Sequence, residues 1–257
     1  MYKWIYKWFP PFLERPEAGP VVGGIFYCFL GMISLPFLLM LFLQGSFDNL
    51  VAVTWCEIIY HALSFLVSII TFRHFLYESF LQVQINGKKI LKSVLVCTLV
   101  AVILALEIGR HMGGVAEGSA YLALYGMLPI VEIDMFVLPI DILYYNPVFG
   151  VICLVVFTPV AISCLYYCSV FAPICERSTW LAYLVTAIFI AIPRLCNGAT
   201  HWIMEEQLAL YFCQLPLHML GCWCFQKNGT VWAPIFLHMA ANLVGCIGWL
   251  VLFSIGA

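Results

Sequence analysis

Three histidines and an asparagine near the C-terminal end of the sequence have the types and spacing to form a buried polar site. His201, His218 and His238 belong to three consecutive apolar segments, and Asn242 follows His238 by four residues, on the same helical face. Asn197, four residues before His201, is a further candidate. Imidazole and amide groups can ligate a metal ion, transfer a proton or stabilise an oxyanion. We therefore predict a functional site of one of these three kinds.

The composition places these residues in a membrane protein. Hydrophobic residues make up 64% of the 257 positions and charged residues only 9%, whereas soluble domains have about 45–50% and about 25%. So few charges could not cover the surface of a soluble fold of this size. The net charge of −2 provides no basic surface for nucleic acid. The composition therefore predicts the lipid bilayer as a partner and excludes a nucleic-acid-binding role.

Several apolar runs approach or exceed the roughly 20 residues that a helix needs to cross a bilayer. They predict an all-α, polytopic bundle of about seven transmembrane helices. With the N-terminus in the cytoplasm, nine of the eleven Lys and Arg residues fall on the inner side, as the positive-inside rule requires. We predict a multi-pass protein of the cell membrane with this orientation. The predicted spans are 21–44, 50–72, 91–108, 148–175, 179–201, 204–226 and 231–254.

Two regions follow from this arrangement. Residues 1–147 would contain an amphipathic lead-in, three transmembrane helices and a long loop, and residues 148–257 a core of four helices. The N-terminal region has one polar pair at membrane depth, Glu57 and His61, which are four residues apart and share a helical face. Such residues are costly in a membrane, and the pair predicts either a contact between helices or a proton relay.

The segment CFQKNGTVWAPIFLHMAANL resembles the last motif of the CPBP family, also called the Abi family. This family groups intramembrane CAAX-type proteases with bacteriocin-processing and immunity proteins. The middle motif of the family is Phe-x-x-x-His, and here His201 lies 37 residues before His238 while Asn197 takes the position of the Phe. The residues that match the last motif are Lys227, Gly229, Trp232, Pro234, His238 and Asn242.

The first motif of the family, Glu-Glu-x-x-x-Arg, is degenerate in this chain. In the segment TPVAISCLYYCSVFAPICER, Ile162 and Ser163 take the positions of the two glutamates and Tyr167 that of the arginine. The resemblance, which covers about residues 150–250, implies a CAAX-type metallo-endopeptidase. It further implies His201, His238 and Asn242 as catalytic residues, a zinc-type divalent metal on the two histidines, and a membrane-associated peptide or lipidated protein as substrate.

The substitutions leave more than one function open. Peptide hydrolysis needs a water activated by a base or a metal, and Ile162 supplies neither. The resemblance therefore implies a CAAX-protease-like endopeptidase or a diverged descendant, with a residual route through the histidines. The alternative is a catalytically inactive, immunity-type or peptide-binding membrane protein. A small transporter is a third possibility, although no internal repeat supports it.

Two geometric expectations follow for the site. His201 and His238 should share one cavity with Asn242, and His218 is the substitute partner of His238 if His201 lies at another depth. Ser163 and Tyr167 are four residues apart, so their hydroxyl groups could bond to each other or to a peptide backbone.

Overall fold

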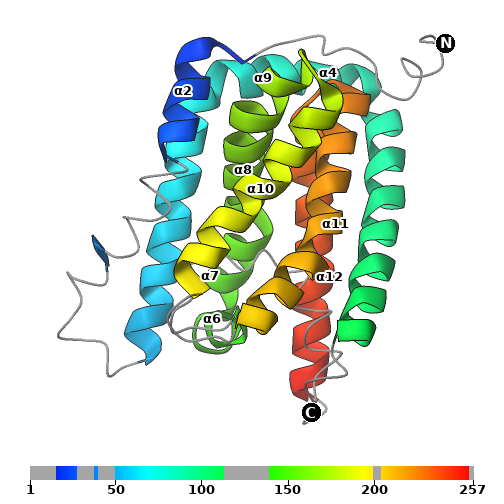
Figure 1. Cartoon of the computed structure of the whole chain (residues 1–257). Coiled ribbons are helices and arrows are strands. Elements are labelled where there is room, and N and C mark those ends of the chain that lie inside the picture. Colours follow the sequence, from blue (N-terminus) through cyan, green and yellow to red (C-terminus); the bar gives the residue numbers. More distant parts are fainter. Residues whose placement is uncertain (1–15, 28–37, 40–49, 113–138, 199–203, 255–257) are drawn as a thin grey trace.

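The computed structural model describes residues 16–27, 38–39, 50–112, 139–198 and 204–254. Within these ranges the chain forms helices and short turns, with no strand. Long helices lie side by side in one bundle (Figure 1). The all-α prediction is therefore confirmed for the described residues. Most of the predicted first span, 21–44, lies outside them; helix α2 (Ala18–Phe26), Tyr27 and residues 38–39 are described there.

Helix α4 (Leu50–Met112) is 63 residues long and turns back on itself. Non-helical backbone at Phe72 (φ −106°, ψ 16°) and Asn86 (φ −113°, ψ 17°) divides it into two long limbs. A helical connection joins the limbs across one end of the bundle (Figure 1). The limbs contain the predicted spans 50–72 and 91–108. The residues between these spans, predicted only as a connection, therefore stay helical.

This connection is helical because its sequence is amphipathic. Phe75, Leu76 and Ser79 are buried, whereas Tyr77 and Glu78 are exposed. Apolar residues recurring at three- and four-residue intervals give one buried stripe on a helix. Such a stripe holds the connection against the end of the bundle.

The helical run from Pro147 to Cys175 alternates between α- and π-helical turns, and its middle part is buried. Every residue from Thr158 to Ala172 is buried, as expected for a helix that is apolar all round. Each π-helical stretch ends two residues before a proline, Pro159 or Pro173. Because proline lacks an N–H and crowds the carbonyl four residues earlier, a wider turn relieves the conflict. The elements are α7 (Pro147–Ile152), η3 (Cys153–Phe157), α8 (Thr158–Ile162), η4 (Ser163–Phe171) and α9 (Ala172–Cys175); the short helix α6 (Pro139–Tyr145) precedes them.

Three helices complete the bundle: α10 (Thr179–Gly198), α11 (Met204–Asn228) and α12 (Trp232–Ser254). Gly229, in the turn between α11 and α12, has φ of 65°, a backbone conformation that glycine adopts without strain. The Thr230 side chain lies 2.8 Å from Ser79 Oγ, and Trp232 Nε1 donates to Leu76 O at 2.9 Å. These bonds fix the start of α12 against the connection in α4.

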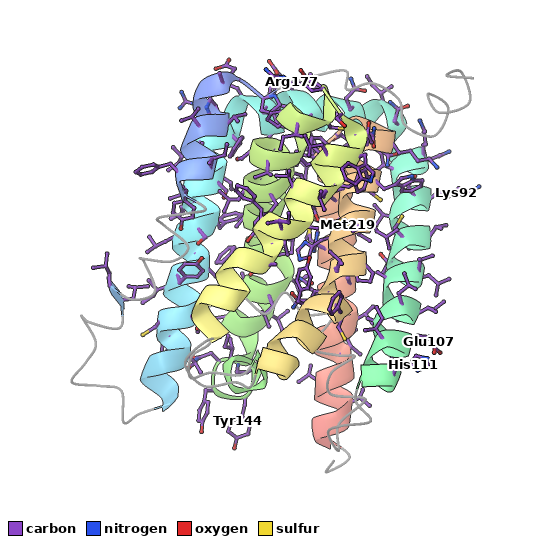
Figure 2. The ribbon with its side chains drawn as sticks, viewed as in Figure 1. Lys92, Glu107, His111, Tyr144, Arg177 and Met219 are labelled. Carbon is purple, nitrogen blue, oxygen red and sulfur yellow. The ribbon has the colours of Figure 1, made fainter. Side chains whose placement is uncertain are left out.

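The described helices have the length and surface expected in a membrane. Two of them, Thr54–Ile108 and Pro147–Cys175, are long and apolar enough to cross a bilayer, and Thr179–Ala191 and Trp232–Gly248 are shorter apolar helices. In Figure 2, Arg177 lies at one end, and Glu107, His111 and Tyr144 lie toward the other.

Candidate functional site

A buried cluster of one tyrosine and two histidines forms where η4, α11 and α12 meet. The Tyr167 hydroxyl lies 2.7 Å from His238 Nε2 and 3.4 Å from His218 Nδ1. The centroids of the two imidazole rings are 5.0 Å apart. Tyr167 and His238 are fully buried, and His218 is 4% exposed. Tyr167, which takes the position of the arginine in the first motif, thus contacts two of the three C-terminal histidines.

Gly221 makes room for this cluster. It lies on α11, one turn beyond His218, and a Cβ added there would overlap the Tyr167 hydroxyl and its ring. A phenol ring can therefore reach the two imidazoles only because position 221 has no side chain. The sequence predicted neither the role of Gly221 nor the contact of Tyr167 with the histidines. A glycine one helical turn after His218 is the sequence signal that could have indicated this contact.

Asn242 is anchored to the central helical run. Its Nδ2 donates to the Leu154 carbonyl oxygen at 2.6 Å, whereas its Oδ1 has no partner within the described structure. Leu154 lies in η3, where the π-helical turn shifts the backbone hydrogen bonds. One of the two Nδ2 hydrogens that could stabilise an oxyanion is thus already bonded inside the protein.

Three buried polar atoms in this region lack a hydrogen-bond partner among the described residues: Ser163 Oγ, His238 Nδ1 and Asn242 Oδ1. Ser163 lies along the central run between Leu154, which Asn242 contacts, and Tyr167, which His238 contacts. The expected bond between Ser163 and Tyr167 does not form, because the phenol hydroxyl turns toward the imidazoles. An unpaired buried polar group is costly, so a water or ligand at these atoms would be stabilising.

The remaining predicted site residues are distributed as follows. Ile162 is buried in the hydrophobic core beside Ser163. Asn197 belongs to α10, although its side chain is not among those described, and His201 lies outside the described residues. The predicted meeting of His201 with His238 therefore stays a prediction. The substitute partner, His218, does lie against His238.

One comparison with known proteins gives a match. Residues 144–244 match the family described as type II CAAX prenyl endopeptidase Rce1-like. Residues 144–244 belong to the CPBP family. This segment contains all three motif regions, and residues 1–143 lie outside it. No curated protein and no solved structure matches the chain.

Among its described residues, the CPBP segment presents no donor set that fits a zinc-type metal ion, and the second predicted ligand, His201, lies outside them. Zinc sites are built from histidine, cysteine and carboxylate ligands, but Ile162 and Ser163 replace the two carboxylates of the motif. One nitrogen of the predicted ligand His238 is engaged by the Tyr167 hydroxyl. Within the described ranges, no group of three or more His, Cys, Asp or Glu side chains could hold a metal ion. We therefore derive no step through a metal.

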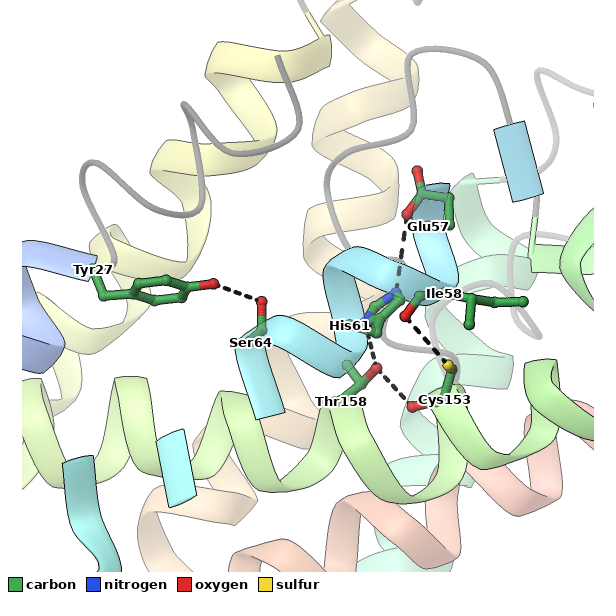
Figure 3. Close-up of polar contacts among 7 residues, drawn as sticks. All are labelled: Tyr27, Glu57, Ile58, His61, Ser64, Cys153 and Thr158. Carbon is green, nitrogen blue, oxygen red and sulfur yellow. Dashed lines mark hydrogen bonds and ion pairs between the residues drawn. The ribbon is translucent and has the colours of Figure 1, made fainter. Parts of the chain in front are cut away.

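A second buried polar cluster joins the first limb of α4 to the CPBP segment (Figure 3). Glu57 Oε2 lies 4.0 Å from His61 Nε2, and His61 Nδ1 lies 2.8 Å from Thr158 Oγ1. Thr158 also bonds to the Cys153 carbonyl oxygen, at 2.9 Å. The predicted contact of Glu57 with His61 thus extends to the helix that carries the first motif.

Proposed function

We propose that this protein is a membrane-embedded, diverged CPBP protein that holds a membrane-associated peptide or lipidated protein without cleaving it efficiently. The observation that carries the proposal is the 2.7 Å contact of the Tyr167 hydroxyl with His238 Nε2. A histidine acts as general base through a free ring nitrogen that reaches the attacking water. In this site the phenol hydroxyl engages Nε2, so only Nδ1 is left without a partner, and no carboxylate of the motif remains to act as the base.

The alternative of an active endopeptidase is less well supported. The residual route would need His238 as base and the Asn242 amide as oxyanion donor. Both groups have internal partners, Tyr167 and the Leu154 carbonyl. With Nε2 of His238 and one amide hydrogen of Asn242 engaged, and with no motif carboxylate present, the geometry favours binding over turnover.

Peptide binding is supported by the three unpartnered atoms. Ser163 Oγ, His238 Nδ1 and Asn242 Oδ1 together could accept from and donate to a peptide backbone. These side chains are fully buried, so a peptide would enter only when the surrounding helices part. Family resemblance indicates a farnesylated CAAX peptide as the first probe.

We predict that Ser163→Ala weakens binding of a fluorescent farnesylated CAAX peptide about three- to tenfold, the effect of one neutral hydrogen bond. The measurement is fluorescence anisotropy with purified protein in detergent. Ser68→Ala is the matched control, because Ser68 is also buried with an unpartnered hydroxyl but lies in α4. Equal affinities for all three proteins, or no binding by the wild type, would contradict the proposal.

We further propose seven membrane spans with a cytoplasmic N-terminus. The charge bias of the sequence supports this orientation. The exposed Arg177 lies in the turn between α9 and α10, at the end of the bundle opposite Tyr144 (Figure 2).

This topology has a direct test. A protease-cleavable tag inserted after Arg177 should be cut from the cytoplasmic side, and the same tag after Asn146 only from the opposite side. Cleavage of both tags from one side would refute the arrangement.

A further inference from the structure

A pocket of about 580 Å³ opens between α2, α9 and the start of α10, apart from both polar clusters. Its volume is in the range of small-molecule sites, about 300–1,000 Å³. Its walls include the apolar side chains of Val21, Val22 and Leu181, and Glu176 and Arg177 also line it. The pocket thus combines an apolar interior with one residue of each charge.

Arg177 provides a binding group for phosphate. Its side chain is exposed, and the ion pairs found among the described residues do not include its guanidinium. Arginine binds phosphate through two parallel hydrogen bonds. Helix α10 begins two residues later, so the positive end of its dipole lies beside the same position. Both features favour a phosphate at this edge of the pocket.

Glu176 restricts which phosphate-bearing ligand fits. Its carboxylate lines the same pocket and would repel a ligand that carries only negative charge. A ligand with a phosphate for Arg177 and an ammonium group for Glu176 matches both charges. The headgroups of phosphatidylethanolamine and phosphatidylcholine have this pattern.

The surface next to the pocket could bind the acyl chains of such a lipid. Exposed apolar side chains continue from the pocket along both walls, at spacings that keep them on one face of each helix. One row runs along α2 and the other along α10, so each could accompany one acyl chain. The residues are Val22 (65% exposed) and Phe26 (65%) on α2, and Leu181 (43%), Leu184 (42%) and Ile188 (50%) on α10.

We propose that this pocket is a binding site for a zwitterionic glycerophospholipid. The phosphate binds Arg177, the ammonium group faces Glu176, and the acyl chains lie along α2 and α10. The lipid would hold α2 against the CPBP segment at the end of the bundle where Arg177 lies. This site is independent of the proposed peptide binding.

Native mass spectrometry of the purified full-length protein tests the proposal. The detergent-solubilised protein is titrated with phosphatidylethanolamine and with phosphatidylglycerol of the same acyl chains. We expect the wild type to prefer phosphatidylethanolamine, and Arg177→Gln to lower its affinity about tenfold, the loss of one charged hydrogen-bonded contact. Arg73→Gln is the matched control, because Arg73 is also an exposed arginine but does not line the pocket.

Two further variants separate the pocket from general surface charge. Val22→Trp fills the pocket without changing its charge and should also weaken lipid binding, and Glu176→Gln should shift the preference toward phosphatidylglycerol. Equal losses in Arg177→Gln and Arg73→Gln would overturn the proposal, as would undiminished binding by Val22→Trp. A wild-type preference for phosphatidylglycerol would overturn the choice of a zwitterionic lipid.

Discussion

The triple variant Ile162→Glu, Ser163→Glu, Tyr167→Arg is expected to cleave a farnesylated CAAX peptide at least 10²-fold faster than the wild type, whose turnover should be near background. A general base typically contributes about 10²–10⁴-fold, and the variant supplies two carboxylates where the chain has none. It also frees His238 Nε2, because the 2.7 Å contact with the Tyr167 hydroxyl is lost. The measurement is peptide cleavage by purified protein in detergent, with chromatographic detection of the product.

Two controls make this result interpretable. Tyr167→Arg alone frees the imidazole but restores no carboxylate, so it should stay near background. The triple variant combined with His238→Ala should lose the recovered activity. The opposite outcome is robust cleavage by the wild type that disappears in His238→Ala. It would overturn the non-proteolytic proposal and favour a histidine-based mechanism.

The sequence predicted the broad architecture because burial in a membrane depends on the length and composition of apolar runs. The predicted spans 179–201, 204–226 and 231–254 correspond to α10, α11 and α12 within a few residues. It did not predict that the connection between the limbs of α4 is helical. The amphipathic pattern around Phe75 and Leu76 is compatible with a helix, but burial of these side chains against other helices stabilises it, and the sequence alone does not show that burial.

Prediction of the site was limited in another way. Motif spacing assigned Tyr167 to the position of the arginine, but spacing does not say which partner a side chain will choose. The choice of His238 over Ser163 depends on the space that Gly221 leaves on a different helix. In the same way, Glu57 and His61 were predicted to contact each other, but their link to Thr158 joins elements about 97 residues apart in the sequence.

His61→Leu is expected to destabilise the protein by about 2–3 kcal/mol, the cost of removing one member from a buried polar cluster. His61 contacts Glu57 at 4.0 Å and Thr158 at 2.8 Å, and it is 2% exposed. Leucine would remove both contacts while filling much of the same volume. The loss of stability would therefore come from the missing polar contacts more than from changed packing. The measurement is the midpoint of thermal unfolding in detergent, and His74→Leu, an exposed histidine of the same helix, is the control.

The double variant Glu57→Leu, His61→Leu decides how this loss arises. Removing both partners of a buried polar contact is far less costly than removing one, because no carboxyl group is then left beside a leucine. Thr158 keeps its bond to the Cys153 carbonyl oxygen in either variant. We therefore expect the double variant to be more stable than His61→Leu alone.

If His61→Leu unfolds at the wild-type temperature, the polar cluster does not hold α4 against the helix that carries the first motif. If the double variant is less stable than His61→Leu, Glu57 and His61 contribute to stability independently. The contact of His61 with Thr158, and not that with Glu57, then accounts for the effect of His61→Leu.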